Sequence, residues 1–215
     1  MREKHKRRKN DLKTIILDHL YKNIKSYIVV IIIFIIGITL GVIFVNNTNE
    51  SELTEIQEYI TGFVDSLKQD YHIDKIELLK KSIWDNLILI LSMWFLGLAV
   101  IGIPIVFAIV LYRSFCIGYT ISAAIAVLGT QKGIIFLLST IFLQNLIFIP
   151  VIIFMTISCI KLYKSIMKDK RRENIKIEII RHTIVSIILF VLLVVASLIE
   201  VYVSTNILML TINTI

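Results

Sequence analysis

Five long apolar segments constrain what this chain can fold into more than any other feature of its sequence. They run over residues 27–45, 87–112, 115–129, 134–160 and 184–203. A helix needs about 20 predominantly apolar residues to cross the hydrocarbon core of a bilayer. The third segment is short by that measure, and the second and fourth are long enough to tilt or bend. The pattern predicts an all-α, polytopic integral membrane bundle of five transmembrane helices.

The composition agrees with a membrane protein. Hydrophobic residues make up 57% of the chain and charged residues 18%, whereas a soluble domain is closer to half apolar and a quarter charged. A net charge of +7 could indicate binding to nucleic acid, but here the basic residues flank the apolar segments. Membrane orientation explains them better, and we expect contact with anionic lipid and none with nucleic acid.

The distribution of Lys and Arg predicts the orientation. Residues 1–26 carry nine of them and residues 161–182 eight, while residues 46–86 carry four against nine acidic residues. Basic loops stay in the cytoplasm. We therefore expect a basic cytoplasmic tail (1–26), an outer loop (46–86), a cytoplasmic loop (161–182) and an extracytoplasmic C-terminus in the cell membrane, with residues 27–215 forming one membrane domain.

The outer loop carries apolar residues at helical spacing in two stretches. The first includes Ile56, Tyr59, Ile60 and Phe63, and the second begins at Ile73 and leads towards the next span. Two short amphipathic helices are predicted. Either their apolar faces pack on the bundle or lie among lipid headgroups, or they dock a partner's extracellular domain.

Small residues predict close helix packing in two spans. Gly37 and Gly41 form a GxxxG motif in the first, and Gly118 and Ser122 repeat the spacing in the third. Short side chains let helices approach closely in lipid, where packing drives association. The patterns indicate a compact bundle without naming a partner helix, and homo-oligomer formation stays an open alternative.

The two prolines predict bends. Pro104 and Pro150 both fall inside apolar segments, and Gly102 precedes the first. A proline within a helix removes a backbone donor and crowds the carbonyl four residues earlier. The freed carbonyls then need partners from neighbouring helices or from water.

Polar side chains in the fourth and fifth segments are the candidate functional residues. Glu200 lies towards the outer end of the last segment, and Gln144 and Asn145 lie at a similar expected depth in the fourth. A carboxylate within a bilayer is costly and marks a functional site by default. We expect a buried polar cluster of Glu200 with Gln144 or Asn145, serving as a structural or docking element or lining a permeation path.

Catalytic chemistry has little support in the sequence. The chain has neither a nucleophile–base motif, nor a Gly-rich phosphate loop, nor HExxH. Its histidines are scattered singly, and Cys116 and Cys159 fall in apolar segments as reduced packing residues. We expect no enzyme activity, no metal and no cofactor.

With these elements in order, the chain resembles the stage II sporulation protein M family along nearly its whole length. The motifs that carry the resemblance are short and recur in a fixed order: Trp84-Asp85-Asn86, Gly97…Gly102-Ile-Pro104, Arg113-Ser-Phe-Cys-Ile-Gly118-Tyr, Gln144-Asn145…Ile149-Pro150 and Ser197-Leu-Ile-Glu200-Val-Tyr202-Val-Ser. The closing motif adds Tyr202 to the structural or docking candidates.

The resemblance implies a role in forespore engulfment during endospore formation. Family members act in the mother-cell or septal membrane with sporulation proteins D and P, which degrade peptidoglycan, and have no hydrolase activity themselves. The chain is thus interpreted as a membrane scaffold that recruits these enzymes. The alternative is a permease subunit of a transporter or channel. Transport pathways usually need several intramembrane polar groups, and the sequence shows only one clear intramembrane charge, Glu200, which argues against this alternative.

Overall fold

The fold is an all-helical membrane bundle. A computed structural model describes residues 12–68, 74–99, 101–168 and 172–211, and these contain helices and no strand. Five helical stretches are long and apolar enough to cross a membrane. They are Asn23–Asn46, Lys75–Leu98, Gly102–Leu128, Thr130–Met167 and Ile175–Leu208. The predicted fold class is confirmed.

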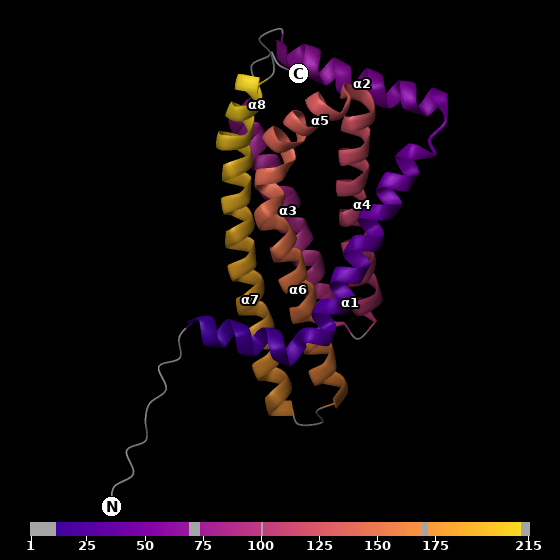
Figure 1. Cartoon of the computed structure of the whole chain (residues 1–215). Coiled ribbons are helices and arrows are strands. Elements are labelled where there is room, and N and C mark those ends of the chain that lie inside the picture. The colour runs from indigo at the N-terminus through magenta and orange to yellow at the C-terminus, as the bar shows by residue number, and fades with distance from the viewer. Residues whose placement is uncertain (1–11, 69–73, 100, 169–171, 212–215) are drawn as a thin grey trace, which may run out of the picture.

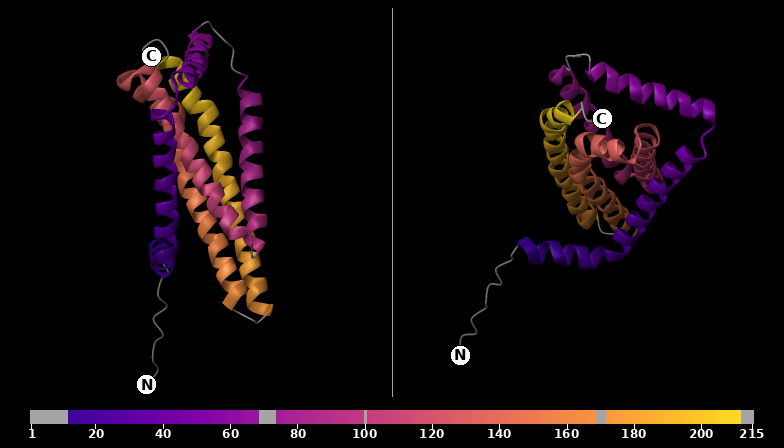
Figure 2. Two further views of the ribbon diagram at one scale, coloured as in Figure 1. Left: turned by 90° about the vertical axis from the view of Figure 1, so that its right-hand side faces the viewer. Right: turned by 45° about the horizontal axis from the view of Figure 1, so that its top comes forward.

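The helices run up and down between two ends of the bundle (Figure 1). Helix α1 (Leu12–Asn46) begins across the lower end and then rises to the upper end, where α2 (Glu50–Lys68) lies across the bundle. Helix α3 (Lys75–Leu98) descends and α4 (Gly102–Leu128) ascends. Figure 2 shows the same arrangement from two other directions.

The second half of the chain repeats this pattern. A short helix α5 (Thr130–Leu137) leads through a π-helical segment η1 (Leu138–Phe142) into α6 (Leu143–Lys168), which descends. Helix α7 (Arg172–Ile199) returns through a second π-helical segment, η2 (Glu200–Ser204), and α8 (Thr205–Thr211). Gly129, between α4 and α5, has a φ of 77°, a conformation that suits glycine in a reversal of the chain.

The boundary between the second and third spans differs from the predicted one. The predicted segment 87–112 crosses the true turn, because α3 ends at Leu98 and α4 starts at Gly102. The turn is closed by hydrogen bonds from Ala99 N–H to the Leu96 carbonyl and from Gly102 N–H to the Ala99 carbonyl. The third span is therefore not short: the 27 residues of α4 extend over about 40 Å.

Pro104 consequently lies in the first turn of α4 instead of bending a span. The first N–H groups of a helix have no partner within it, so proline is tolerated there. A side chain on Gly102 would meet the Leu96 carbonyl oxygen at 1.9 Å, which explains a residue without Cβ at this turn. The predicted bend at Pro104 was wrong, whereas Pro150 lies inside α6 as expected.

Both predicted loops are shorter in the structure. The second amphipathic stretch of the outer loop is the start of α3, where the Asp74 carboxylate accepts hydrogen bonds from the N–H groups of Ile76 and Glu77. The predicted cytoplasmic loop is mostly helix, because α6 continues to Lys168 and α7 begins at Arg172. Part of the predicted tail (1–11) and residues 169–171 and 212–215 lie outside the described residues.

The small residues join α1 to α4. A Cβ on Gly41 would lie 2.3 Å from the Phe115 carbonyl oxygen, and one on Gly118 would lie 2.2 Å from the Ile38 carbonyl oxygen. The two backbones touch, which only glycine allows. Gly37 packs against Ser114 in the same seam, and Ser122 contacts Asn46 at 3.4 Å. The predicted motifs thus have specific partners: each other.

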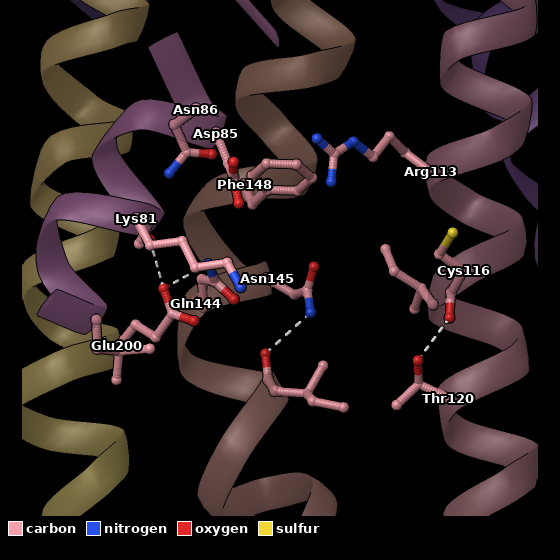
Figure 3. Close-up of a pocket in the computed structure, with 14 residues that line it drawn as sticks. Lys81, Asp85, Asn86, Arg113, Cys116, Thr120, Gln144, Asn145, Phe148 and Glu200 are labelled. Carbon is pink, nitrogen blue, oxygen red and sulfur yellow. Dashed lines mark hydrogen bonds between the residues drawn. The ribbon is translucent and has the colours of Figure 1, made fainter. Parts of the chain in front are cut away.

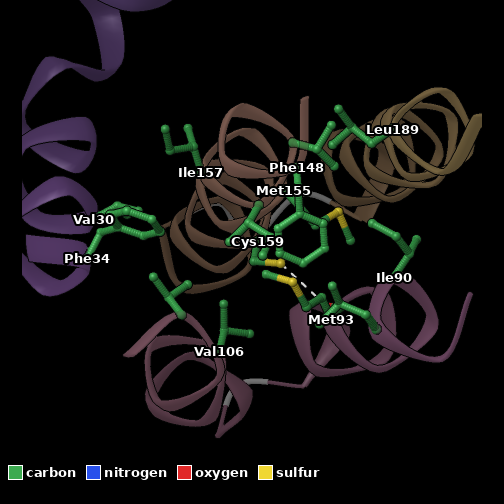
Figure 4. Close-up of a cluster of buried hydrophobic side chains, with 14 of the residues drawn as sticks. Val30, Phe34, Ile90, Met93, Val106, Phe148, Met155, Ile157, Cys159 and Leu189 are labelled. Carbon is green, nitrogen blue, oxygen red and sulfur yellow. Dashed lines mark hydrogen bonds between the residues drawn. The ribbon is translucent and has the colours of Figure 1, made fainter. Parts of the chain in front are cut away.

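An apolar core fills the lower half of the bundle (Figure 4). We call this region the closed half and define it by residues 27–34 of α1, 89–93 of α3, 106–110 of α4, 151–160 of α6 and 189–193 of α7. Several of its side chains are completely buried: Val30, Met93, Val106, Val110, Met155, Cys159 and Leu193. Burial of this kind fixes the five spans relative to one another at their lower ends.

Candidate functional site

The upper half of the bundle contains a polar cavity of about 470 Å³ (Figure 3). We call this region the polar half and define it by residues 78–86 of α3, 113–120 of α4, 141–148 of η1 and α6, and Glu200 of η2. Its cavity is lined by apolar and polar side chains from these elements: Leu78, Lys81, Ser82, Asp85, Asn86, Arg113, Cys116, Ile117, Thr120, Ile141, Gln144, Asn145, Phe148 and Glu200. A space of this size can hold about fifteen water molecules.

Glu200 is fixed by two neighbours. Its Oε2 accepts a hydrogen bond of 2.6 Å from the Ser82 hydroxyl and one of 2.8 Å from the Gln144 amide. Charge-assisted bonds of this kind offset part of the cost of placing a carboxylate in a membrane-spanning helix. The structure thus brings Glu200 and Gln144 together, as the sequence led us to expect.

The cluster continues into the bundle through α3. The Asn86 amide donates to the Ser197 hydroxyl at 2.9 Å, and the Ser82 hydroxyl lies 2.9 Å from the same oxygen. Ser197 in turn donates to the Leu193 carbonyl. The carboxylate therefore sits at the edge of a connected polar network between α3 and α7, and the cavity lies on its open side.

Both π-helical segments lie beside this cluster. In η2, the backbone N–H and the hydroxyl of Thr205 both donate to the Glu200 carbonyl. In η1, the Asn145 amide donates to the Ile141 carbonyl at 3.0 Å. A π-helical turn inserts an extra residue into a helix and frequently occurs at functional sites. Here each π-helical segment contributes a side chain to the cavity lining, Ile141 from η1 and Glu200 from η2.

Asn145 therefore does not bond Glu200, although it lines the same cavity. Its amide donates to the Ile141 carbonyl of the π-helical turn. Tyr202 is 47% exposed and does not line the cavity. Of the four polar candidates, the structure brings three together and leaves Tyr202 on the outer surface of the bundle.

The sequence reasoning missed three charged residues of the site: Lys81, Asp85 and Arg113. Arg113 was assigned to a connection, but it lies inside α4, with its guanidinium 5.6 Å from the centre of the Phe148 ring. Asp85 was assigned to the outer loop, but it lies inside α3. The pair Gly102-Ile-Pro104 was the available signal, because proline favours the first turn of a helix. Starting the third span there places Arg113 within the membrane.

A second cavity of about 280 Å³ adjoins the first. Asp85 and Arg113 line both, and the other lining residues of the second cavity come from α3 and α4: Ile88, Leu89, Ser92, Ile109 and Tyr112. Tyr112 is 64% exposed. The two charged residues thus stand between the interior cavity and a hollow that opens between α3 and α4.

Among the residues that the structure describes, no group of three or more His, Cys, Asp and Glu side chains could hold a metal ion. His182 is buried in the closed half, where its Nδ1 lies 2.8 Å from the Ser158 hydroxyl. The arrangement of charges at the cavity is suited to binding polar groups within the membrane.

The fold and the cavity define the class: a multi-pass helical membrane protein with a charged cavity inside its spans. The chain belongs to the stage II sporulation protein M family, whose model matches residues 30–205. This match includes every residue that lines the cavity. Comparisons with curated proteins and with solved structures give no match. Family membership supports a role in sporulation.

Proposed function

We propose that the protein is a non-enzymatic membrane scaffold of endospore formation. In this proposal it holds peptidoglycan-degrading partners, sporulation proteins D and P, at the septal membrane during engulfment. The observation that carries the proposal is the family match over residues 30–205. The proposal extends the sporulation role of the family to a specific task, which the structure supports with a candidate docking surface.

That surface is the exposed face of α2 at the upper end of the bundle (Figure 1). One face of the helix is attached to the bundle, where Val64 is buried and the Phe63 ring contacts the Phe136 ring edge-on at 6.4 Å. The helix also exposes Tyr59 and four glutamates: Glu50, Glu52, Glu55 and Glu58. A rigid helix with an exposed aromatic ring among charges suits recognition of a basic partner surface.

The proposal requires α2 to lie outside the cytoplasm. Lys161, Lys164, Lys176 and Arg181 all lie towards the opposite, lower end, and basic residues favour the cytoplasmic side. Cysteines introduced at Glu58 and at Lys176, in a chain whose native cysteines are replaced by alanine, test this. An impermeant thiol reagent should label the first in intact cells and the second only after lysis. The same labelling pattern at both positions would overturn the orientation.

Recovery of partners from sporulating cells tests the function. Tagged protein should co-purify with the two peptidoglycan-degrading proteins, and the double variant Glu55→Lys/Glu58→Lys should lose them because it reverses the charge of the docking face. Glu77→Lys, an exposed charge reversal in α3, should retain them. Recovery of transporter ATPases without any peptidoglycan hydrolase would contradict the scaffold.

A permease subunit is the second candidate, and the cavity favours it. The sequence shows one clear intramembrane charge, Glu200, but Lys81, Asp85 and Arg113 also lie within spanning helices and line the cavity. Ion and substrate pathways are lined by such groups. If the protein is a permease, proteoliposomes should show solute flux that Arg113→Gln abolishes, while partner recovery through α2 stays absent.

A further inference from the structure

The charges of the polar cavity are balanced in number but not paired. Lys81 and Arg113 are basic, and Asp85 and Glu200 are acidic. Within the part of the chain that the structure describes, no ion pair joins any two of them. A charge inside a membrane span is costly unless a counter-charge or water compensates it. The cavity therefore presents charges of both signs to whatever fills it.

Arg113 and Glu200 lie on opposite sides of the cavity, and Lys81 lies on the side of Glu200 (Figure 3). Arg113 projects from α4 on one wall, and its guanidinium stacks on Phe148 without a hydrogen bond to any described residue. A guanidinium offers five N–H donors in a planar fork that fits phosphate oxygens. The Arg113 guanidinium is thus not hydrogen-bonded to an oxygen acceptor of any described residue.

The opposite wall offers acceptors. Glu200 uses Oε2 for Ser82 and Gln144, and its Oε1 accepts no hydrogen bond from a described residue. The side-chain carbonyl oxygens of Gln144 and Asn145 are likewise unused, because their amide groups donate elsewhere. Each of these three side chains thus offers an oxygen acceptor to a donor such as a primary ammonium group.

We propose that the polar cavity binds the zwitterionic headgroup of an aminophospholipid, with the phosphate at Arg113 and the ammonium at Glu200. A purely anionic headgroup would satisfy Arg113 but meet the carboxylates of Asp85 and Glu200. A zwitterion satisfies both walls and leaves the net charge of the cavity unchanged. This site does not depend on the scaffold function.

The membrane location favours a lipid over a soluble compound of the same chemistry. The lining residues all lie within spanning helices, and the second cavity between α3 and α4 reaches the exposed side chain of Tyr112. Asp85 and Arg113 line both cavities. A headgroup can enter between α3 and α4 while its acyl chains remain in the bilayer.

Lipid retention by the purified full chain tests the proposal. The detergent-solubilised protein is incubated with equimolar dioleoyl phosphatidylethanolamine and dioleoyl phosphatidylglycerol, and bound lipid is counted by native mass spectrometry. We expect retention of phosphatidylethanolamine to exceed that of phosphatidylglycerol by about tenfold, the effect of one charge-assisted hydrogen-bond set. Equal retention of the two lipids would overturn the proposal.

Two variants test the contributions of Glu200 and Arg113 to lipid binding separately. Glu200→Gln should abolish the preference for phosphatidylethanolamine, and Arg113→Gln should lower retention of both lipids. The matched controls Glu178→Gln and Arg181→Gln remove the exposed pair at the lower end and should leave retention unchanged. Gel filtration and thermal unfolding verify the fold of each variant, and Arg113→Lys replaces any Arg113 variant that does not fold. Lipid retention by both cavity variants equal to that of the unmodified chain would refute the site.

A competition experiment with a soluble headgroup compound tests whether the ligand is a lipid. Glycerophosphoethanolamine, which has the same phosphate and ammonium without acyl chains, should not displace the lipid at equal concentration. Displacement would overturn the lipid assignment and leave a soluble headgroup compound as the ligand.

Discussion

The two halves of this bundle are built from the same helices, yet one is closed and the other is hollow. In the closed half, α3, α4, α6 and α7 meet through side chains such as Met93, Val106, Met155 and Leu193, all completely buried. In the polar half, α3, α4, η1, α6 and η2 surround a cavity of about 470 Å³ that is lined by charged side chains. Phe148 lies at the boundary, belonging to the apolar core and to the cavity lining.

The lower, closed half of the bundle provides stability, and the upper, polar half holds the candidate functional site. Packing in lipid depends on close contact, because apolar helices gain little by leaving apolar lipid. The closed half supplies this contact at the lower end, and the α1–α4 seam supplies it on the outer side of α4. The remaining helices of the polar half can then stand apart and hold unpaired polar groups without the bundle separating.

The largest expected loss of stability comes from a substitution that creates a cavity in the closed half. Leu193→Ala should lower the free energy of unfolding by about 2–5 kcal/mol, because the truncated side chain is completely buried and its neighbours relax only partly. The matched control is Leu192→Ala, since Leu192 is 42% exposed at the next position of α7. Steric-trap unfolding in bilayers would measure both. Equal losses at the two positions would contradict a packed lower core.

The α1–α4 seam should respond to an added methyl group. Gly118→Ala places a Cβ 2.2 Å from the Ile38 carbonyl oxygen, so the helices must separate at a cost of about 1–3 kcal/mol. Gly62→Ala in α2 is the control, because nothing lies within 4 Å of the added Cβ. There the higher helix propensity of alanine should slightly stabilise the protein. Thermal unfolding in detergent measures both variants. A similar loss of stability in Gly118→Ala and Gly62→Ala would contradict close backbone contact in the α1–α4 seam.

Replacing each native cysteine with the larger leucine compares how tightly the two halves are packed. Cys159→Leu should destabilise by about 1–3 kcal/mol, because Cys159 is completely buried and contacts the Met93 carbonyl at 3.4 Å. Cys116→Leu should cost less, since Cys116 lines the cavity and the added carbons enter free space. The same unfolding assay ranks them. A larger loss at Cys116 would mean that the polar half is as tightly packed as the closed half.

Sequence reasoning recovered the features that depend on neighbours along one helix. Runs of apolar residues gave five spans, and Gly37, Gly41 and Gly118 indicated close packing. The shared depth of Glu200 and Gln144 followed from counting residues under an assumed topology, and the two side chains do form a hydrogen bond.

The features that depend on the break between helices were missed. Apolar segments on both sides of Ala99–Ile101 merge into one hydropathy peak, so the turn was displaced towards Arg113 because a charge marks a loop in hydropathy reasoning. This error hid the intramembrane charge of Arg113. The charges of Lys81 and Asp85 were missed because the second span was predicted to start at residue 87, whereas α3 starts at Lys75. The two π-helical segments, which contact each other, were not predicted either.

Modification of the native cysteines tests the central contrast most directly. The chain is reconstituted in bilayers and treated with a small water-soluble thiosulfonate that attacks thiolates only where water reaches them. We predict that Cys116 in the polar cavity is modified while Cys159 in the closed half stays protected until the protein unfolds. Equal protection of the two cysteines, or faster modification of Cys159, would contradict a closed lower half and a hydrated upper half.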